Sequence, residues 1–244
     1  MTESTRPLNA AIDRLPADVF TAFGQLAPTD LCDVVDLSCV MRYAIRPLWP
    51  GMPRIAGPAF TVRTGKHDNL MFHAAIYLAK RGDVIVVEAG DDEMAVAGGN
   101  VCAIAQRNGV AGLVVDGVIR DVGESRANLF PVFARGASPI PAKRGGGGDM
   151  NATIRCGGVV VNPGDVVVAD EEGVVVVPQS PGDGRARQGA GPRGHGLGDD
   201  PRGLGKAPSR RRRGRALRQG LPSLLRRPPC PSPTTSAARS ASSP

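Results

Sequence analysis

The chain has 244 residues, which fits one domain of ordinary size or two small ones, and its net charge is +7. The charge is uneven: residues 179–244 hold 14 of the 30 basic and 3 of the 23 acidic residues, so they carry +11 and residues 1–178 carry −4. A mildly acidic body makes nucleic acid an unlikely partner, and no apolar run approaches the roughly 20 residues that a membrane-spanning helix needs.

The N-terminal residues lack the basic and then apolar pattern of a secretion signal. The five cysteines form no CxxC pair and no zinc-type spacing with histidine, which is typical of a reducing compartment. We therefore expect a soluble, cytoplasmic protein.

The N-terminal residues contain few candidates for catalytic or binding residues. Residues 8–23 predict a helix with a break or fresh start at Pro16, and residues 28–36 predict a second short helix. The loop at residues 42–57 is rich in Pro, Gly and Arg and contains Trp49, so we interpret it as the cover of a core or an interface.

Residues 58–64 alternate as a strand does, and residues 69–80 predict a helix with an apolar stripe. Asp68 is expected to cap this helix, although Asp68 and Asn69 follow a strand and can also line a pocket. His73, inside the helix, is interpreted as a packed or surface histidine.

Residues 84–90 form an apolar run that predicts a buried strand. Four carboxylates follow at its carboxyl end. One of them can accept a hydrogen bond from a metal-bound water, and the sequence does not distinguish which. They are Glu88, Asp91, Asp92 and Glu93.

The most informative stretch runs from Gly98 to Asp121. Gly98, Gly99, Asn100 and Val101 open a helix whose bare backbone N–H groups can face an anionic ligand, and Asn108-Gly109 ends that helix. Residues 112–116 then predict a buried strand followed by Arg120 and Asp121, at the edge where open α/β sheets place ligands.

Arg120 and Asp121 have complementary chemistry. A guanidinium grips a carboxylate through two hydrogen bonds, and an aspartate is a hard oxygen ligand for Mg²⁺ or Mn²⁺. Together with the amides of residues 98–101 they predict a pocket for a small 2-oxo acid on a metal. Spacing alone favours a solvated pair in which Asp121 caps the next helix.

The rest of the body completes a sheet. Residues 122–129 predict a short helix, and residues 131–136 predict a strand. The glycine-rich residues 143–152 lack the ending of a phosphate-binding loop and are interpreted as a flexible connection. Residues 157–178 alternate short strands and turns, which favours an antiparallel section. The fold class is therefore α/β, a compact α/β/α sandwich with a mixed central sheet.

The stretch GGNVCAIAQRNGVAGLVVDGVIRD, preceded by GDVIVVEAG and followed by RCGGVVVNPGDVVVADEEGVVVVP, resembles a known family over roughly residues 25–178. It is similar to the 4-hydroxy-4-methyl-2-oxoglutarate and 4-carboxy-4-hydroxy-2-oxoadipate aldolases, a family that also includes the regulator of ribonuclease E activity A. The resemblance implies a swivelling-domain-like fold and assembly as a homotrimer or a hexamer with sites between subunits.

The resemblance also implies roles for individual residues. Arg120 would bind the pyruvate moiety, Asp121 would hold the divalent metal, and Gly98 to Val101 would supply amides to the substrate. Some members have an acidic residue, which orients a metal-bound water, where this chain has Gly99. That departure leaves the water-activating group unassigned.

The implied activity is a metal-dependent retro-aldol cleavage of a 4-hydroxy-2-oxo acid to pyruvate and a second oxo acid, with oxaloacetate decarboxylation as a side activity. Three alternatives remain open, of which one, a basic nucleic-acid-binding protein, rests only on the residues after Pro178. A Schiff-base aldolase needs a desolvated lysine, for which the body offers Lys66, Lys80 and Lys143. A non-catalytic ribonuclease regulator is the family's other branch, and Asp121 favours the enzyme over it.

The residues after Pro178 differ from the body. They are rich in Gly, Pro, Arg and Ser, include the run Arg210 to Arg213, and show no apolar periodicity. We therefore expect a domain at residues 1–178 and a disordered basic tail at 179–244. The tail is either an out-of-frame reading of a helix or a genuine basic tail for nucleic acid.

Overall fold

The structure is a computed structural model that describes residues 11–179. The basic tail that the sequence predicts lies outside the described residues, apart from Gln179. Within the described part, none of the helices is both long and apolar enough to cross a membrane.

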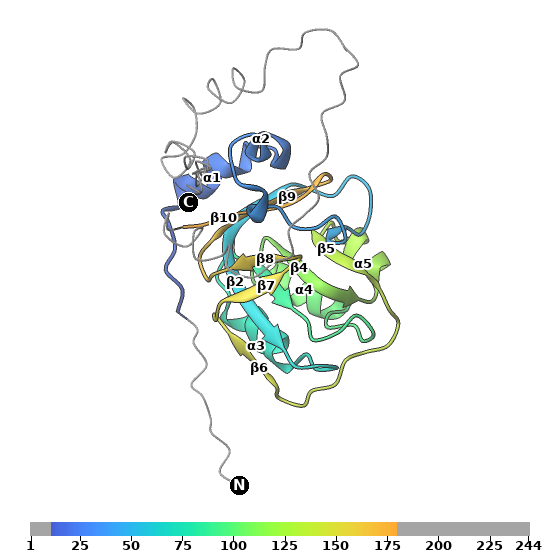
Figure 1. The fold of residues 1–244 in the computed structure, drawn as a ribbon. Helices are drawn as coiled ribbons and strands as arrows, with labels where there is room; N and C mark the ends of the chain where they lie inside the picture. The colour runs from blue at the N-terminus through green and yellow to red at the C-terminus, as the bar shows by residue number, and fades with distance from the viewer. Residues whose placement is uncertain (1–10, 180–244) are drawn as a thin grey trace, which may run out of the picture.

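The centre of the molecule is a parallel sheet of four strands that alternate with three helices (Figure 1). The two inner strands, β3 and β4, are almost wholly buried apolar runs, as parallel strands covered on both faces require. In chain order the elements are β2 (Ile55–Thr64), α3 (Leu70–Leu78), β3 (Val84–Glu88), α4 (Gly99–Arg107), β4 (Gly112–Ile119), α5 (Val122–Ala127) and β5 (Val132–Ala137).

Consecutive strands lie side by side in the order β2, β3, β4, β5, all parallel. Because each crossover between parallel strands is right-handed, α3, α4 and α5 fall on the same face of the sheet. The opposite face is covered by a separate hairpin of β7 (Ile154–Cys156) and β8 (Val159–Val161), which packs on β2 and β3.

Antiparallel strands extend the sheet at both edges and make it mixed. β1 (Arg46–Pro47) pairs with β5, and β6 (Gly148–Met150) pairs with the end of β2. β9 (Val166–Asp170) pairs with the start of β2 and with β10 (Gly173–Val177). The predicted α/β fold with a mixed central sheet is confirmed, but the layer opposite α3, α4 and α5 is the β7–β8 hairpin and not a second layer of helices.

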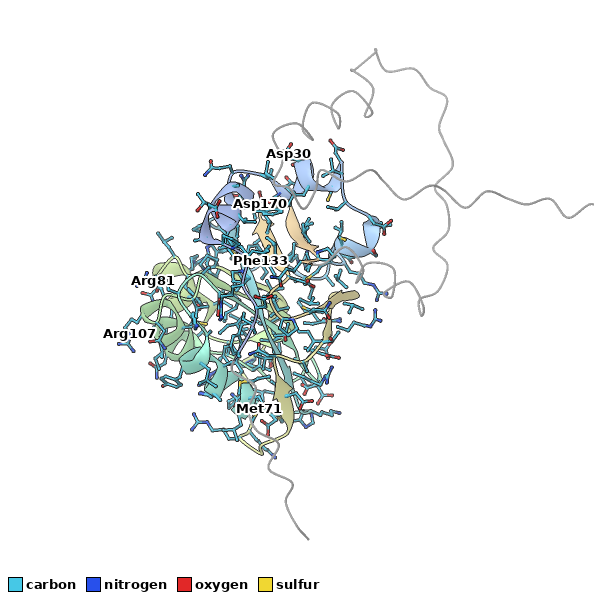
Figure 2. The ribbon with its side chains drawn as sticks, turned by 90° about the vertical axis from the view of Figure 1, so that its left-hand side faces the viewer. Asp30, Met71, Arg81, Arg107, Phe133 and Asp170 are labelled. Carbon is cyan, nitrogen blue, oxygen red and sulfur yellow. The ribbon has the colours of Figure 1, made fainter. Side chains whose placement is uncertain are left out.

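Two hydrophobic cores hold these layers together. The larger lies around the parallel strands, where Phe133 is buried at the centre while Arg81 and Arg107 lie at the periphery (Figure 2). It includes Trp49, so the loop at residues 42–57 covers a core as expected. The smaller core joins β9 and β10 to α1 (Ala17–Gly24) and α2 (Pro28–Cys32). The short 3₁₀ helix η1 (Leu37–Cys39) follows α2 in the chain.

Two predicted helix extents were wrong. The predicted fresh start at Pro16 is confirmed, since Pro16 is the N-cap of a helix that begins at Ala17, but residues 11–16 before it are not helical. Proline disfavours a helical conformation of the residue that precedes it. The second helix ends at Cys32 rather than at residue 36. In addition, β8 pairs with the preceding strand, β7, and not with the following strand, β9, so it belongs to the covering hairpin.

Candidate active site

A backbone loop brings the start of α4 to the end of β4. Ala97 forms an isolated bridge with Ile119, and the Arg120 N–H donates to the Ala97 carbonyl at 2.9 Å. Residues 98–101 and 120–121 therefore lie side by side although about twenty positions separate them. They meet at the carboxyl edge of the parallel sheet, the edge that the sequence predicts for the site.

Asp121 has an unusual backbone conformation that directs its side chain. Its φ of 58° and ψ of 39° lie in the left-handed region, which non-glycine residues seldom adopt and which recurs at functional positions. Asp121 does occupy the N-cap position of α5, but its side chain makes no capping hydrogen bond there. Instead, its Oδ2 accepts the Gly99 N–H at 3.1 Å and lies 3.4 Å from the Arg120 Nε.

Gly98 leaves room for this arrangement. A Cβ at position 98 would lie 2.7 Å from the Asp121 Oδ2 and 3.0 Å from the Arg120 Nε. A Cβ at Gly99 would lie 2.0 Å from an oxygen of Glu124. The Gly99 N–H is already taken by Asp121, so the expectation that this amide faces a ligand was wrong.

Arg120 and Asp121 line a cavity of about 740 Å³ together with Gly98, Asn100 and Val101. Five of the six predicted site residues thus share one cavity, and Gly99 is the exception. The side chains of Arg120 and Asp121 are 43% and 38% exposed, so both can be reached by a ligand.

The opposite wall comes from α3 and its N-cap residue, Asn69. The sequence allowed Asn69 as a pocket residue, but His73 and Tyr77 were not predicted as functional. Asn69, His73 and Tyr77 all line the cavity. They are spaced at i, i+4 and i+8, which places them on one helical face, and this polar stripe is the sequence signal that could have identified them. Asn69 is buried, its amide nitrogen donates to the Val96 carbonyl at 3.3 Å, and its Oδ1 accepts no hydrogen bond within residues 11–179.

Arg144 influences the protonation of His73 in this wall. Burial and, next, the positive charge of Arg144 lower the pKa of His73 below its usual value of 6.5. The neutral imidazole therefore predominates at neutral pH. Arg144 lines the cavity from the loop that follows β5. Arg120 and Arg144 thus both contribute permanent positive charge to the same cavity.

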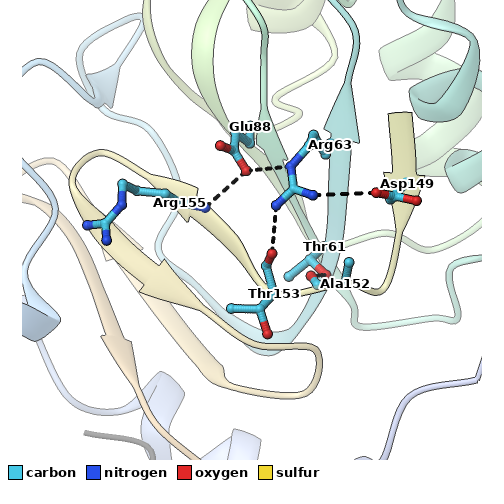
Figure 3. Close-up of polar contacts among 7 residues, drawn as sticks. All are labelled: Thr61, Arg63, Glu88, Asp149, Ala152, Thr153 and Arg155. Carbon is cyan, nitrogen blue, oxygen red and sulfur yellow. Dashed lines mark hydrogen bonds and ion pairs between the residues drawn. The ribbon is translucent and has the colours of Figure 1, made fainter. Parts of the chain in front are cut away.

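The four carboxylates after β3 were a candidate water-activating group, but none of them lines this cavity. Glu88, Asp91 and Asp92 instead line a second cavity of about 830 Å³ with three arginines. Glu88 is held there by the Arg63 Nε at 3.0 Å and by the Arg155 N–H at 3.1 Å (Figure 3).

Hydrogen bonds of the same kind hold two further acids of the second cavity, Asp116 and Asp91. Asp116 accepts from the Arg135 Nε at 2.5 Å and from the Gly157 N–H at 2.9 Å. Burial raises the pKa of Asp91, but backbone N–H groups that donate to its carboxylate outweigh this effect and lower the pKa overall. These carboxylates stabilise loops and the covering hairpin.

The donor set of the first cavity fits a divalent cation. Within residues 11–179 the Asp121 Oδ1 makes no hydrogen bond, so one carboxylate oxygen is free to bind a metal. No group of three or more His, Cys, Asp or Glu side chains in this part of the chain could enclose an ion. Mg²⁺ typically keeps several waters and takes one or two protein carboxylates, and Asp121 meets that need.

A Schiff-base site finds no support in the same residues. Lys66, Lys80 and Lys143 are all exposed to solvent, and none lines the cavity of Arg120. A nucleophilic lysine needs a desolvated setting to lose its proton near neutral pH.

Comparison with known proteins identifies the family. A family model described as "RraA-like: Aldolase/RraA" matches residues 28–176, which is more than half of the chain. The chain belongs to the RraA-like family. Arg120, Asp121 and the cavity between α3 and α4 all lie inside the matched region.

Two relatives in the RraA-like family carry the same name. A protein of Halalkalibacterium halodurans, "Putative 4-hydroxy-4-methyl-2-oxoglutarate aldolase", is 42% identical over 163 residues, which cover 66% of this chain and 77% of the relative. A Burkholderia multivorans protein of that name is 36% identical, with 62% and 94% covered.

Solved structures show the RraA-like fold directly. The RNA-processing inhibitor RraA from Thermus thermophilis is 29% identical with a TM-score of 0.58, and the match covers 64% of this chain and 94% of that one. The RraA-like family thus contains proteins named as aldolases and a protein named as an inhibitor of RNA processing.

Proposed function

We propose that this protein is a divalent-metal-dependent aldolase that cleaves a 4-hydroxy-2-oxo dicarboxylic or tricarboxylic acid to pyruvate and a second oxo acid. The observation that carries the proposal is the Arg120–Asp121 pair, which a left-handed residue and a bare glycine direct into one cavity. The relatives named as 4-hydroxy-4-methyl-2-oxoglutarate aldolases support the substrate class.

Each residue has a defined task in this reaction. Asp121 would hold Mg²⁺ or Mn²⁺, and the bound ion supplies Lewis-acid stabilisation of the pyruvate enolate. Arg120 donates hydrogen bonds to the carboxylate and keto oxygen of the 2-oxo acid and stabilises the negative charge that develops there as the C3–C4 bond breaks. Gly98 keeps the space between the two side chains open.

Oxaloacetate decarboxylation is the expected side activity. It passes through the same pyruvate enolate, so the same donors stabilise it. The Oδ1 of Asn69 accepts no hydrogen bond from any residue between 11 and 179, so it can orient a hydroxyl group of the longer substrate.

The first prediction concerns the pair itself. Arg120→Ala and Asp121→Ala should each lower turnover about a hundredfold or more, because one preorganised donor to a developing oxyanion is worth about 3 to 4 kcal/mol. Pyruvate release from 4-hydroxy-4-methyl-2-oxoglutarate, followed with and without Mg²⁺, measures this. Arg126→Ala is the matched control, since Arg126 is exposed on α5 and does not line the cavity.

Removing the metal tests the mechanism separately. EDTA should abolish pyruvate release, and added Mg²⁺ or Mn²⁺ should restore it. Full activity in EDTA, or near-normal turnover of either alanine variant, would refute the assignment.

The second candidate function is non-catalytic regulation of a ribonuclease, which the fold of the RNA-processing inhibitor favours. Inhibition of RNA cleavage by a purified ribonuclease E, together with no pyruvate release under any metal condition, would support this alternative.

A further inference from the structure

The glycine-rich loop after Arg144 encloses a carboxylate of the chain itself. The Asp68 side chain is buried, and its Oδ2 accepts the N–H groups of Gly145 and Gly146, the latter at 2.7 Å. The Asp68 Oδ1 accepts the Leu70 N–H, also at 2.7 Å. Successive backbone N–H groups that converge on one anion form a nest of the type that elsewhere binds phosphate.

The run of glycines is needed for this approach. A Cβ at Gly145 would lie 2.7 Å from the Asp68 Oδ2. Gly146 has a φ of +95°, and Gly148 has a φ of +124° with the Arg63 carbonyl 2.1 Å from its Cβ position. The interpretation of this segment as a flexible connection was therefore wrong: its glycines allow the loop to close on Asp68.

The same contacts fix the backbone on both sides of Arg144. Before it, the Lys143 N–H donates to the His67 carbonyl at 2.7 Å and the Lys143 carbonyl accepts the Asn69 N–H at 2.9 Å. After it come the two glycines held by Asp68.

The side chain of Arg144 has no partner to neutralise it. It lines the cavity that Arg120 and Asp121 also line, and within residues 11–179 it makes no ion pair or hydrogen bond. Two arginines and one aspartate give this cavity a positive net charge before any cation is added. Such a field favours a ligand with more than one negative group.

We propose that Arg144 binds the second carboxylate of a dicarboxylic 2-oxo acid, and that Asp68 is the positioning residue that holds Arg144 in place through the glycine nest. The inference rests on the proposed function, in which Arg120 and Asp121 bind the 2-oxo acid end. It adds the residue, Arg144, that makes the site prefer a dicarboxylic ligand over a monocarboxylic one.

The test compares two probes that the enzyme does not cleave. Calorimetry in Mg²⁺ should show that the unmodified protein binds 2-oxoglutarate about tenfold or more tightly than pyruvate, because a charge-assisted pair to the second carboxylate is added. Arg144→Ala and Asp68→Asn should each reduce this preference to about threefold or less, with pyruvate binding little changed. The double variant should be no worse than Arg144→Ala alone.

Asp165→Asn is the matched control. Asp165 is a buried carboxylate that also accepts backbone N–H groups, from Asn162 at 2.8 Å and Gln179 at 3.0 Å, but it does not line the cavity. This variant should retain the full preference for 2-oxoglutarate. If Asp68 had a purely structural role, Asp68→Asn would instead weaken the binding of 2-oxoglutarate and of pyruvate equally.

A second pair of variants guards against poor folding of Asp68→Asn. Gly145→Ala keeps the carboxylate but pushes the loop away from it, and Gly136→Ala is its control because no atom lies within 4 Å of that Cβ position. Hydrogen exchange of the peptide over residues 141–150 should become faster in Gly145→Ala and in Asp68→Asn and stay unchanged in Gly136→Ala.

The outcomes separate this inference from the proposed function. If the protein cleaves no 4-hydroxy-2-oxo acid but its preference for 2-oxoglutarate depends on Arg144 and Asp68, the aldolase fails and the dicarboxylate site stands. If cleavage occurs and both variants keep the preference, the inference is overturned. Unchanged loop exchange in Gly145→Ala and Asp68→Asn would overturn the positioning role of Asp68.

Discussion

Individual side chains in the cavity have their charge state set by their neighbours. His73 lies between the buried interior and the cation of Arg144, and both disfavour a second positive charge. The polar wall formed by α3 is therefore neutral at neutral pH, and the positive charge of the cavity belongs to the two arginines.

We predict that His73 titrates below 6.5 and that Arg144→Ala raises its pKa, with burial still holding it under 6.5. Because the folded pKa is lowered, the unfolded chain binds the proton more readily, so stability is retained above pH 6.5 and declines as the pH falls below it. NMR titration of the His73 ring measures both pKa values. An unchanged pKa in Arg144→Ala would show that the guanidinium does not act on this ring.

At the scale of elements, the start of α4 and the end of β4 are fitted to each other. The bridge between Ala97 and Ile119 fixes their separation, and Gly98 alone leaves enough space for two charged side chains. The start of α4 thus contributes to the site both the space left by Gly98 and the N–H group of Gly99, which binds Asp121.

We predict that Gly98→Ala lowers turnover at least tenfold, because the new Cβ must displace the Asp121 carboxylate or the Arg120 guanidinium. Gly123→Ala is the control, since its Cβ position has no atom within 4 Å. Steady-state kinetics with thermal unfolding separates the cases: Gly98→Ala should remain folded, and a loss of activity that merely follows a loss of fold would contradict the prediction.

At the scale of the whole molecule, a buried ion pair joins the N-terminal segment to the sheet. Arg14 donates to both oxygens of Asp83 at 2.9 and 2.6 Å, and the Lys80 N–H donates to the same carboxylate at 2.8 Å. Asp83 is fully buried at the turn before β3, so these hydrogen bonds replace the water that its carboxylate loses on folding.

We predict that Arg14→Ala lowers the free energy of unfolding by about 3 kcal/mol, because it leaves a buried carboxylate without its counter-ion. Urea denaturation measures the change. Arg107→Ala, at the exposed end of α4, should cost less than about 1 kcal/mol. Equal losses in the two variants would mean that the Arg14–Asp83 pair is as weak as a surface contact.

The central helices and strands, and the half of the site whose residues are close in the chain, could be predicted from the sequence. The buried strands β3 and β4 are short apolar runs between turns, and Gly109, with a φ of +85°, ends α4 where the asparagine and glycine predict it. Arg120 and Asp121 reach residues 98–101 through a single helix and strand. Period, turn chemistry and one right-handed crossover are local properties, so the sequence fixes them.

The opposite wall of the site and the partners of the remaining carboxylates depend on contacts between distant segments, so they required the three-dimensional structure. Asn69 and Arg144 are far apart in the chain, and they meet because Lys143 and Asn69 share a backbone hydrogen bond. Glu88 looked available for catalysis but is held by Arg63 and Arg155, which come from two other strands. Whether a carboxylate serves a ligand or a neighbouring loop depends on long-range packing, which the periodicity of a single segment does not encode.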